Sequence, residues 1–179
     1  MAGYFSAATF RTIGNAATTQ NLLTIENLDA TKLIFVRRLV FQMDALAVLV
    51  AVMPIVKTSR STGVPTGGTV LAKALWNTAN ASNANTIVRG STATDGGANS
   101  GPIATPDAAQ LLWEQYGMRL HTLAGQVLGL DNNQLPALVD TQNLVLRQNQ
   151  ALVVQVVAAA GASNPATNHY FCQVAWEED

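Results

Sequence analysis

The uncharged stretch between Asp44 and Lys57 constrains the fold most, because an extended chain of this sequence cannot face water on either side. It reads ALAVLVAVMPIV, 12 residues in which both alternating faces are apolar. A membrane-spanning helix needs about 20 apolar residues, and Pro54 interrupts this run. We therefore predict a strand over 46–56, with one face in the domain's core and the other against a second sheet or a sister subunit. Its two faces would be Val48, Val50 and Val52 on one side, and Leu49, Ala51 and Met53 on the other.

Charged side chains are scarce in this chain. They make up 12% of its residues, whereas typical soluble domains carry about 25%. With 179 residues the chain is long enough to form one hydrophobic core that needs no disulfide bonds for stability. A net charge of −1 and the absence of any Lys/Arg run give no electrostatic reason to bind nucleic acid or an anionic membrane. A surface so poor in charge indicates partial burial in an assembly.

Aromatic residues mark the N-terminal segment at Tyr4, Phe5 and Phe10. We predict that residues 1–18 form an arm and that residues 19–179 form a single β-sandwich domain. Two uses of the arm stay open: it packs back on its own domain, or it anchors to a neighbour. The segment lacks the basic region and apolar core of a secretory signal, so we expect synthesis in a cytoplasm.

Alternating apolar residues predict strands along much of the chain. Over 32–43 the odd positions are apolar except Arg37, which predicts a strand with its odd face in the core. Arg37 and Arg38 would then point to opposite faces. The one toward the apolar side would form a salt bridge, snorkel to the sheet margin, or contact another subunit. Further strands are expected over 22–28, 70–76, 86–89, 126–130, 143–147, 151–158 and 169–176.

One segment stays open between helix and strand. Pro106 and Asp107 could begin a short helix in which Leu112 and Tyr116 share a face, but the same residues also alternate as a strand. Long loops rich in Gly, Ser, Thr, Asn and Ala are expected over 58–69 and 77–106. Strands without βαβ alternation predict an all-β fold, an antiparallel β-sandwich with at most one short helix.

Sequence patterns of catalysis and metal binding are missing. There is no G-x-S-x-G motif, and His121 and His169 lie in no metal-binding pattern. We interpret Asp131-Asn132-Asn133 as a turn, with a calcium site as the alternative. Cys172, the one cysteine, is expected to be buried in a strand. We predict no enzyme activity, no cofactor and no metal, and we assign to core packing Trp76, Trp113 and Trp176.

The order of several segments resembles the small β-sandwich structural proteins of tailed bacteriophages. These segments are QNLLTIENL, KLIFVRRLVFQMD, VMPIVKTSRSTG, WEQYGMRLHT, GQVLGLDNNQLPALVD and VVAAAGASNPATNHYFCQVAWEE. The resemblance covers nearly the whole chain and is one of texture and strand order. It implies a jelly-roll fold, a homotrimer, and a place on the capsid surface as a cement or decoration protein made in the host cytoplasm.

The resemblance implies two partners, a second copy of the chain and the major capsid protein, with no nucleic acid, membrane or small-molecule substrate. Such a protein stabilises the shell because it binds the assembled form. The alternative is a receptor- or carbohydrate-binding sandwich in a phage fibre or tail. The candidate interface residues are Tyr4, Phe5, Phe10, Arg38, Leu49, Met53, Tyr116 and His121.

Overall fold

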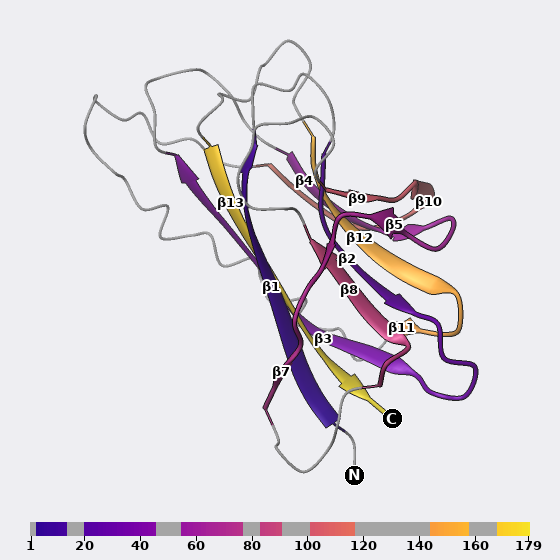
Figure 1. Ribbon diagram of the computed structural model, residues 1–179. Helices are drawn as coiled ribbons and strands as arrows, with labels where there is room; N and C mark the ends of the chain where they lie inside the picture. Colours follow the sequence, from indigo (N-terminus) through magenta and orange to yellow (C-terminus); the bar gives the residue numbers. More distant parts are fainter. Residues whose placement is uncertain are drawn as a thin grey trace.

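Two antiparallel sheets packed as a sandwich make up most of the computed structural model (Figure 1). No helix occurs in the residues that the structure describes, so the expected all-β antiparallel sandwich is confirmed. These residues are 3–13, 20–45, 55–76, 83–90, 101–116, 144–157 and 168–179.

The five-stranded sheet is built round three long strands that come from the two ends and the first third of the chain. Strand β13 lies in its middle and pairs with β1 on one side and with β3 on the other. In order across the sheet the strands are β11 (Val145–Leu146), β3 (Ile34–Ala45), β13 (Asn168–Glu178), β1 (Gly3–Ile13) and β7 (Ala74–Leu75).

The six-stranded sheet has β12 and β2 at its centre. Both are rich in Val, Leu and Ile, and they match the strands predicted over 22–28 and 151–158. In order across the sheet the strands are β10 (Pro106–Tyr116), β4 (Ile55–Ser61), β12 (Gln150–Val157), β2 (Gln20–Asn27), β8 (Thr86–Gly90) and β6 (Thr69–Val70).

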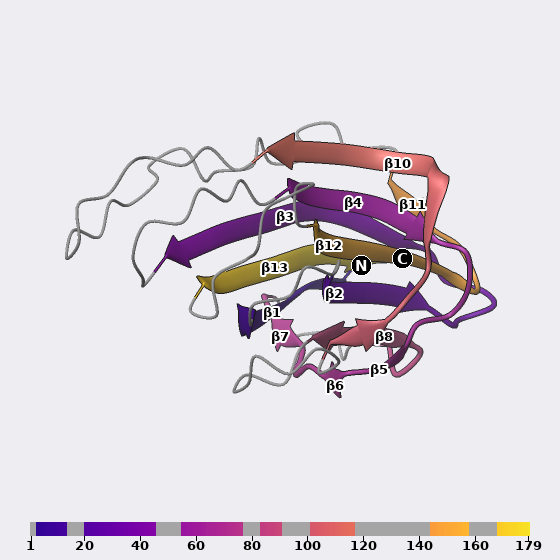
Figure 2. The same cartoon turned by 90° about the horizontal axis from the view of Figure 1, so that it is seen from above.

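A third, smaller layer lies on the outer face of the six-stranded sheet. It is the pair β5 (Thr66–Gly67) and β9 (Pro102–Ile103). The chain leading from β9 to β10 crosses this sheet from its β8 side to its β10 edge (Figure 2). We call residues 62–68 and 101–105 the cover. It lies in two segments that we expected to be long loops.

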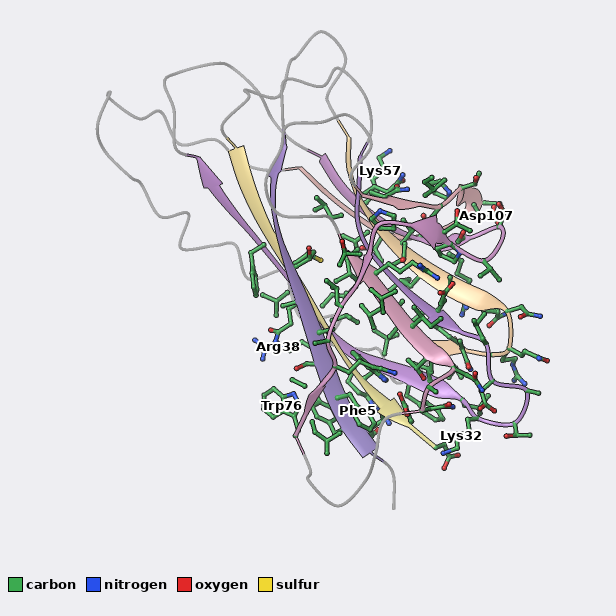
Figure 3. All side chains as sticks on the ribbon, viewed as in Figure 1. Phe5, Lys32, Arg38, Lys57, Trp76 and Asp107 are labelled. Carbon is green, nitrogen blue, oxygen red and sulfur yellow. The ribbon has the colours of Figure 1, made fainter. Side chains whose placement is uncertain are left out.

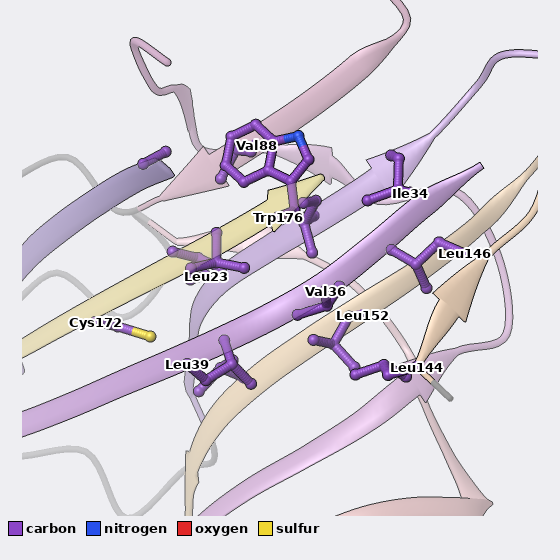
Figure 4. Packing of buried hydrophobic residues seen from close by; sticks show 14 of the residues in the cluster. Leu23, Ile34, Val36, Leu39, Val88, Leu144, Leu146, Leu152, Cys172 and Trp176 are labelled. Atoms are coloured by element: carbon purple, nitrogen blue, oxygen red, sulfur yellow. The ribbon is translucent and has the colours of Figure 1, made fainter. Parts of the chain in front are cut away.

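The core lies between the two large sheets (Figure 4). Trp176 is its largest side chain and is fully buried, stacked on Phe5 with ring centroids 5.9 Å apart. The aliphatic side chains round them come from both sheets, and burying each contributes about 1.5–3 kcal/mol. They include Leu22, Leu23, Ile25, Ile34, Val36, Leu39, Val88, Leu146, Leu152, Val154 and Val174.

A β-bulge changes the face of β3 at the two arginines. The pairing with β13 shifts between Ala175 and Trp176, which leaves Arg37 as the extra residue. Ile34 and Val36 are therefore buried before the bulge, and Leu39 after it. Our prediction of a single buried odd face was wrong, because alternation across a bulge moves the core face from even to odd positions.

The segment over 106–116, for which the sequence allowed either a helix or a strand, is strand β10. Pairing with β4 decides it: Glu114 lies opposite Lys57, and Tyr116 opposite Ile55. Periodicity alone could not decide, because the residues fit both patterns. Backbone hydrogen bonds to a neighbouring strand are long-range and leave no mark in the local sequence.

The apolar stretch of 45–56 does not form one strand from end to end. Ala45 is the last residue of β3 and Ile55 the first of β4, and these strands belong to different sheets. Residues 46–54, with the two faces predicted for them, lie outside the described residues. The two ends of the stretch therefore belong to two separate strands. A uniform run of apolar residues cannot indicate where one strand ends and the next begins.

Candidate functional site

Of the eight predicted interface residues, the structure describes the side chains of three, Tyr4, Phe5 and Arg38. Tyr4 and Phe5 lie on β1 and Arg38 on β3. Phe10 is in β1 and Tyr116 in β10, and their side chains are outside the description. Leu49, Met53 and His121 fall outside the described residues altogether, as does Asp131-Asn132-Asn133.

The N-terminal segment is not a free arm over residues 3–13. It is strand β1, paired with β13 from Gly3–Glu178 to Ile13–Asn168. Phe5 faces the core and is 1% exposed, so it is unavailable for an interface. The aromatics of this segment divide because neighbouring residues of a strand point to opposite faces. Tyr4, next to Phe5, is half-buried on the outer face.

An exposed aromatic pair is built on this outer face by Tyr4 and Trp76, which we call the aromatic edge. Trp76 is 64% exposed and meets Tyr4 edge-on, with ring centroids 5.6 Å apart and an interplanar angle of 81°. Its indole Nε1–H donates to Ser6 Oγ at 2.9 Å, and its backbone N–H donates to the Tyr4 carbonyl at 3.0 Å. The ring is thus exposed and held in one orientation.

Trp76 is exposed, so its predicted place in the core is wrong. Trp176 is in the core as predicted, and the side chain of Trp113 lies outside the description. The local signal at Trp76 was its place at the border of the Asn-rich segment beginning at Asn77. Composition alone could not show that β7 pairs with the edge of β1 and turns the ring outward.

Both arginines of β3 lie outside the core. The guanidinium group of Arg37 donates from Nε to Glu177 Oε2 at 2.6 Å and lies 5.3 Å from the centre of the Phe35 ring. Arg38 is exposed. We expected the two to point to opposite faces of the sheet. The bulge at Arg37 changes the alternation, so neither arginine faces the core. Arg38 and Trp76 project from the same side of the five-stranded sheet, away from the other sheet (Figure 3).

A buried ion pair lies on the outer face of the six-stranded sheet. Arg89 Nε donates to Glu26 Oε1 at 3.1 Å, and the Glu26 side chain is 1% exposed. Arg89 also reaches the cover, donating from Nη1 to the Gly67 carbonyl at 3.4 Å. Burial raises the pKa of Glu26 from its ordinary 4.5, although the charge of Arg89 and its hydrogen bond act in the opposite direction.

The Glu26→Gln variant is expected to be more stable than the natural protein at pH 7 and equally stable near pH 4. A raised pKa means that the folded state holds the proton more tightly than the unfolded chain. The contribution of Glu26 to stability is therefore present below the unfolded pKa and lost as the pH rises through the folded one. Glutamine keeps an acceptor for Arg89 and removes the cost of burying charge.

Urea unfolding of this variant over pH 4–8 measures the difference. Glu177→Gln is the matched control, because it removes a carboxylate from a half-exposed arginine pair and should bring no gain at pH 7. If Glu26→Gln lowers stability at pH 7, attraction to Arg89 outweighs the burial cost and the reasoning is wrong.

A second polar network closes one end of the sandwich. Buried Glu178 accepts the Trp176 indole N–H at 2.9 Å and the Asn83 backbone N–H at 2.7 Å. Lys73 Nζ donates to the carbonyls of Asn83 and Thr86, and burial lowers its pKa. Asp29 accepts bonds from Asn83, Asn85 and Thr31, which lower its pKa. Each group has a structural partner, so this network holds loops in place.

Cys172 is inert in the folded protein. It is fully buried, and burial raises the pKa of its thiol to about 12. We expect no reaction with a colorimetric disulfide reagent at pH 8 in the native state and complete reaction in denaturant. Thr31→Cys, at an exposed position, is the control that should react while folded. Rapid native labelling of Cys172 would mean that the sandwich opens readily.

Within the described ranges no group of three or more His, Cys, Asp or Glu side chains could hold a metal ion, and no helix is long and apolar enough to cross a membrane. Comparisons with models of protein families, with curated proteins and with solved structures found no match to this chain. Function therefore has to be argued from the aromatic edge, the strand order and the composition.

Proposed function

We propose that this chain is a non-enzymatic structural protein of a virion, a homotrimeric cement or decoration protein that binds and stabilises an assembled capsid. The observation that carries the proposal is the aromatic edge. An ordered tryptophan that is 64% exposed on a rigid sheet is the kind of residue that anchors protein interfaces. The partners are further copies of the chain and the major capsid protein, and the place is the capsid surface.

The strand order supports the jelly-roll type. Strands β1, β2, β3 and β4 alternate between the two sheets, and the C-terminal pair inserts between them: β13 lies between β1 and β3, and β12 between β2 and β4. Such Greek-key winding of two sheets is typical of jelly rolls, which are common in viral capsid proteins. Fold alone does not specify function, so this is support and not the basis of the proposal.

The composition supports a role inside an assembly. Charged residues are 12% of the chain, and Arg37 on the outer face of the five-stranded sheet is already paired with Glu177. A sheet face with few charges, Arg38 among them, and an aromatic anchor costs less to desolvate than a highly charged one when a partner covers it. Three linked copies engaging neighbouring capsid sites would make even a modest contact strong.

Replacing Trp76 with alanine is expected to weaken binding to emptied capsid shells roughly tenfold or more, the effect typical of a tryptophan hot spot. Ile103→Ala is the matched control: its side chain is 65% exposed, but it belongs to the cover on the other side of the molecule. Binding is measured by co-sedimentation with the shells, together with the temperature at which they break open.

Light scattering of the same samples separates the parts of the proposal. A trimer is expected at about three times the chain mass of 18.9 kDa at micromolar concentration. A strict monomer that neither binds shells nor raises their disruption temperature would overturn the proposal. If Trp76→Ala breaks the trimer instead, Trp76 lies between subunits and not against the shell.

The second candidate is a carbohydrate- or receptor-binding sandwich of a fibre or tail. The exposed Trp76 ring favours it too, because sugars stack on such rings. A glycan array distinguishes the two: saccharide binding that Trp76→Ala abolishes, without shell binding, would favour this candidate.

A further inference from the structure

Three buried polar side chains face the same way on the six-stranded sheet. Thr24 and Glu26 are two residues apart on β2, so they share a face. Thr24 lies opposite Val153, and Val153 lies opposite Ser59 on β4, which places Ser59 in the same row. The neighbouring Ile25 and Leu152 belong to the core between the sheets. The face of Thr24, Glu26 and Ser59 is therefore the outer one.

This outer face is closed off from solvent. Thr24, Glu26 and Ser59 are 0%, 0% and 2% exposed. The cover is fastened over the sheet by the Asn21 side-chain amide, which donates to the carbonyls of Pro102 at 2.8 Å and Ala104 at 3.1 Å. The two parts of the cover are joined by the Thr62 N–H bond to the Thr105 carbonyl at 2.9 Å. Arg89 adds its bond to the Gly67 carbonyl.

Each of these three side chains has an oxygen without a hydrogen-bond partner. The atoms are Thr24 Oγ1, Glu26 Oε2 and Ser59 Oγ, all inaccessible to solvent. Leaving a buried polar atom unpaired is costlier than a typical hydrogen bond is favourable. Three such atoms on one face, under one cover, indicate that something small and polar pairs with them.

We propose that Thr24, Glu26 and Ser59 line a closed site beneath the cover that binds water molecules, which complete their hydrogen bonds and seat the cover on the sheet. Ala151 lies opposite Glu26 and Val153 opposite Thr24 on the same face. Thr24 and Glu26 stand about 7 Å apart along the strand, so each can hold a water molecule of its own. Buried waters of this kind make about three hydrogen bonds each.

A metal ion fits the same residues poorly. Ser59 is two strands away from Thr24, a separation of roughly 10 Å, so the three oxygens cannot converge on one ion. The only carboxylate among them, Glu26, is already paired with Arg89, whose charge repels a cation. Separate water molecules fit both the wide spacing of the oxygens and the charge of Arg89, because each water is neutral and needs only two to four nearby polar groups.

Oxygen-17 relaxation dispersion tests the site, because it counts water molecules held inside the protein. Thr24→Val and Ser59→Ala each remove one hydroxyl, and each is expected to lower the dispersion amplitude by about the contribution of one water molecule. Thr69→Val is the control: this threonine is exposed on β6, and its replacement should leave the amplitude unchanged.

Unchanged amplitude in both variants would overturn the proposal. A dry site would also reveal itself through stability, since deleting an unpaired hydroxyl would then raise the melting temperature by about 2–4 °C or more. A crystal structure of the natural protein gives a readout that needs no variant. Solvent density within hydrogen-bond distance of Thr24 Oγ1 and Ser59 Oγ is expected, and an empty or collapsed space there would refute the site.

Discussion

Replacing Trp176 with alanine is expected to lower the free energy of unfolding by about 3–5 kcal/mol. Trp176 is fully buried between the sheets and stacks on Phe5 at 5.9 Å, so its removal leaves a large cavity. The variant also takes the indole donor away from Glu178 Oε1, which accepts it at 2.9 Å. A buried carboxylate that loses a donor adds to the cost. Denaturant unfolding of the purified chain measures the loss.

Trp76→Ala is the natural control, because it makes the same change at an exposed site. It loses one bond to Ser6 and one ring contact to Tyr4, and we expect a cost of about 1 kcal/mol or less. Equal losses at the two tryptophans would contradict the placement of Trp176 in the core and Trp76 on the surface.

Replacing Gly68 with alanine is expected to cost about 2–4 kcal/mol, from backbone strain and overpacking together. Gly68 has a φ of +64°, which side-chain-bearing residues rarely adopt. A Cβ at this position would lie 2.6 Å from the Gly90 carbonyl oxygen and 3.0 Å from the Pro102 nitrogen. Both are backbone atoms, so the turn cannot relax without moving the cover or β8.

Gly63→Ala is the control for Gly68→Ala. A Cβ at Gly63 meets nothing within 4 Å, so its stability should change by no more than about 1 kcal/mol, in either direction. Thermal or urea unfolding of the two variants side by side measures the contrast. A Gly68 variant as stable as the Gly63 variant would mean that the cover is not seated against Gly90 as described.

Strands β2, β3 and β12 were predictable because runs of apolar and β-branched residues reflect the packing that every sandwich shares. QNLLTIEN and ALVVQVV carry apolar residues at strand spacing, and they form β2 and β12. The bulge at Arg37 was not predictable, since it depends on the register with β13. The exposure of Trp76 and the burial of Phe5 likewise depend on which strand lies beside β1.

The aromatic edge and the covered face of Thr24, Glu26 and Ser59 show the same division between what the sequence indicates and what the fold decides. Tyr4 was chosen from the sequence as an interface residue, but its neighbour Trp76 was assigned to the core. Thr24 and Glu26 alternate with the apolar residues Leu23 and Ile25, a pattern typical of a strand with one face in solvent. They are buried because residues near 66 and 102, distant in sequence, come together as the cover.

The sequence by itself determined the all-β class, several of the strands and the sparse charge, because these follow from local residue patterns and from the cost of exposing apolar surface. Only the tertiary structure decided which polar faces are covered, where the register shifts and which tryptophan meets solvent. The reason is physical: burial of a side chain depends on what lies above its strand, and that contact comes from remote parts of the chain.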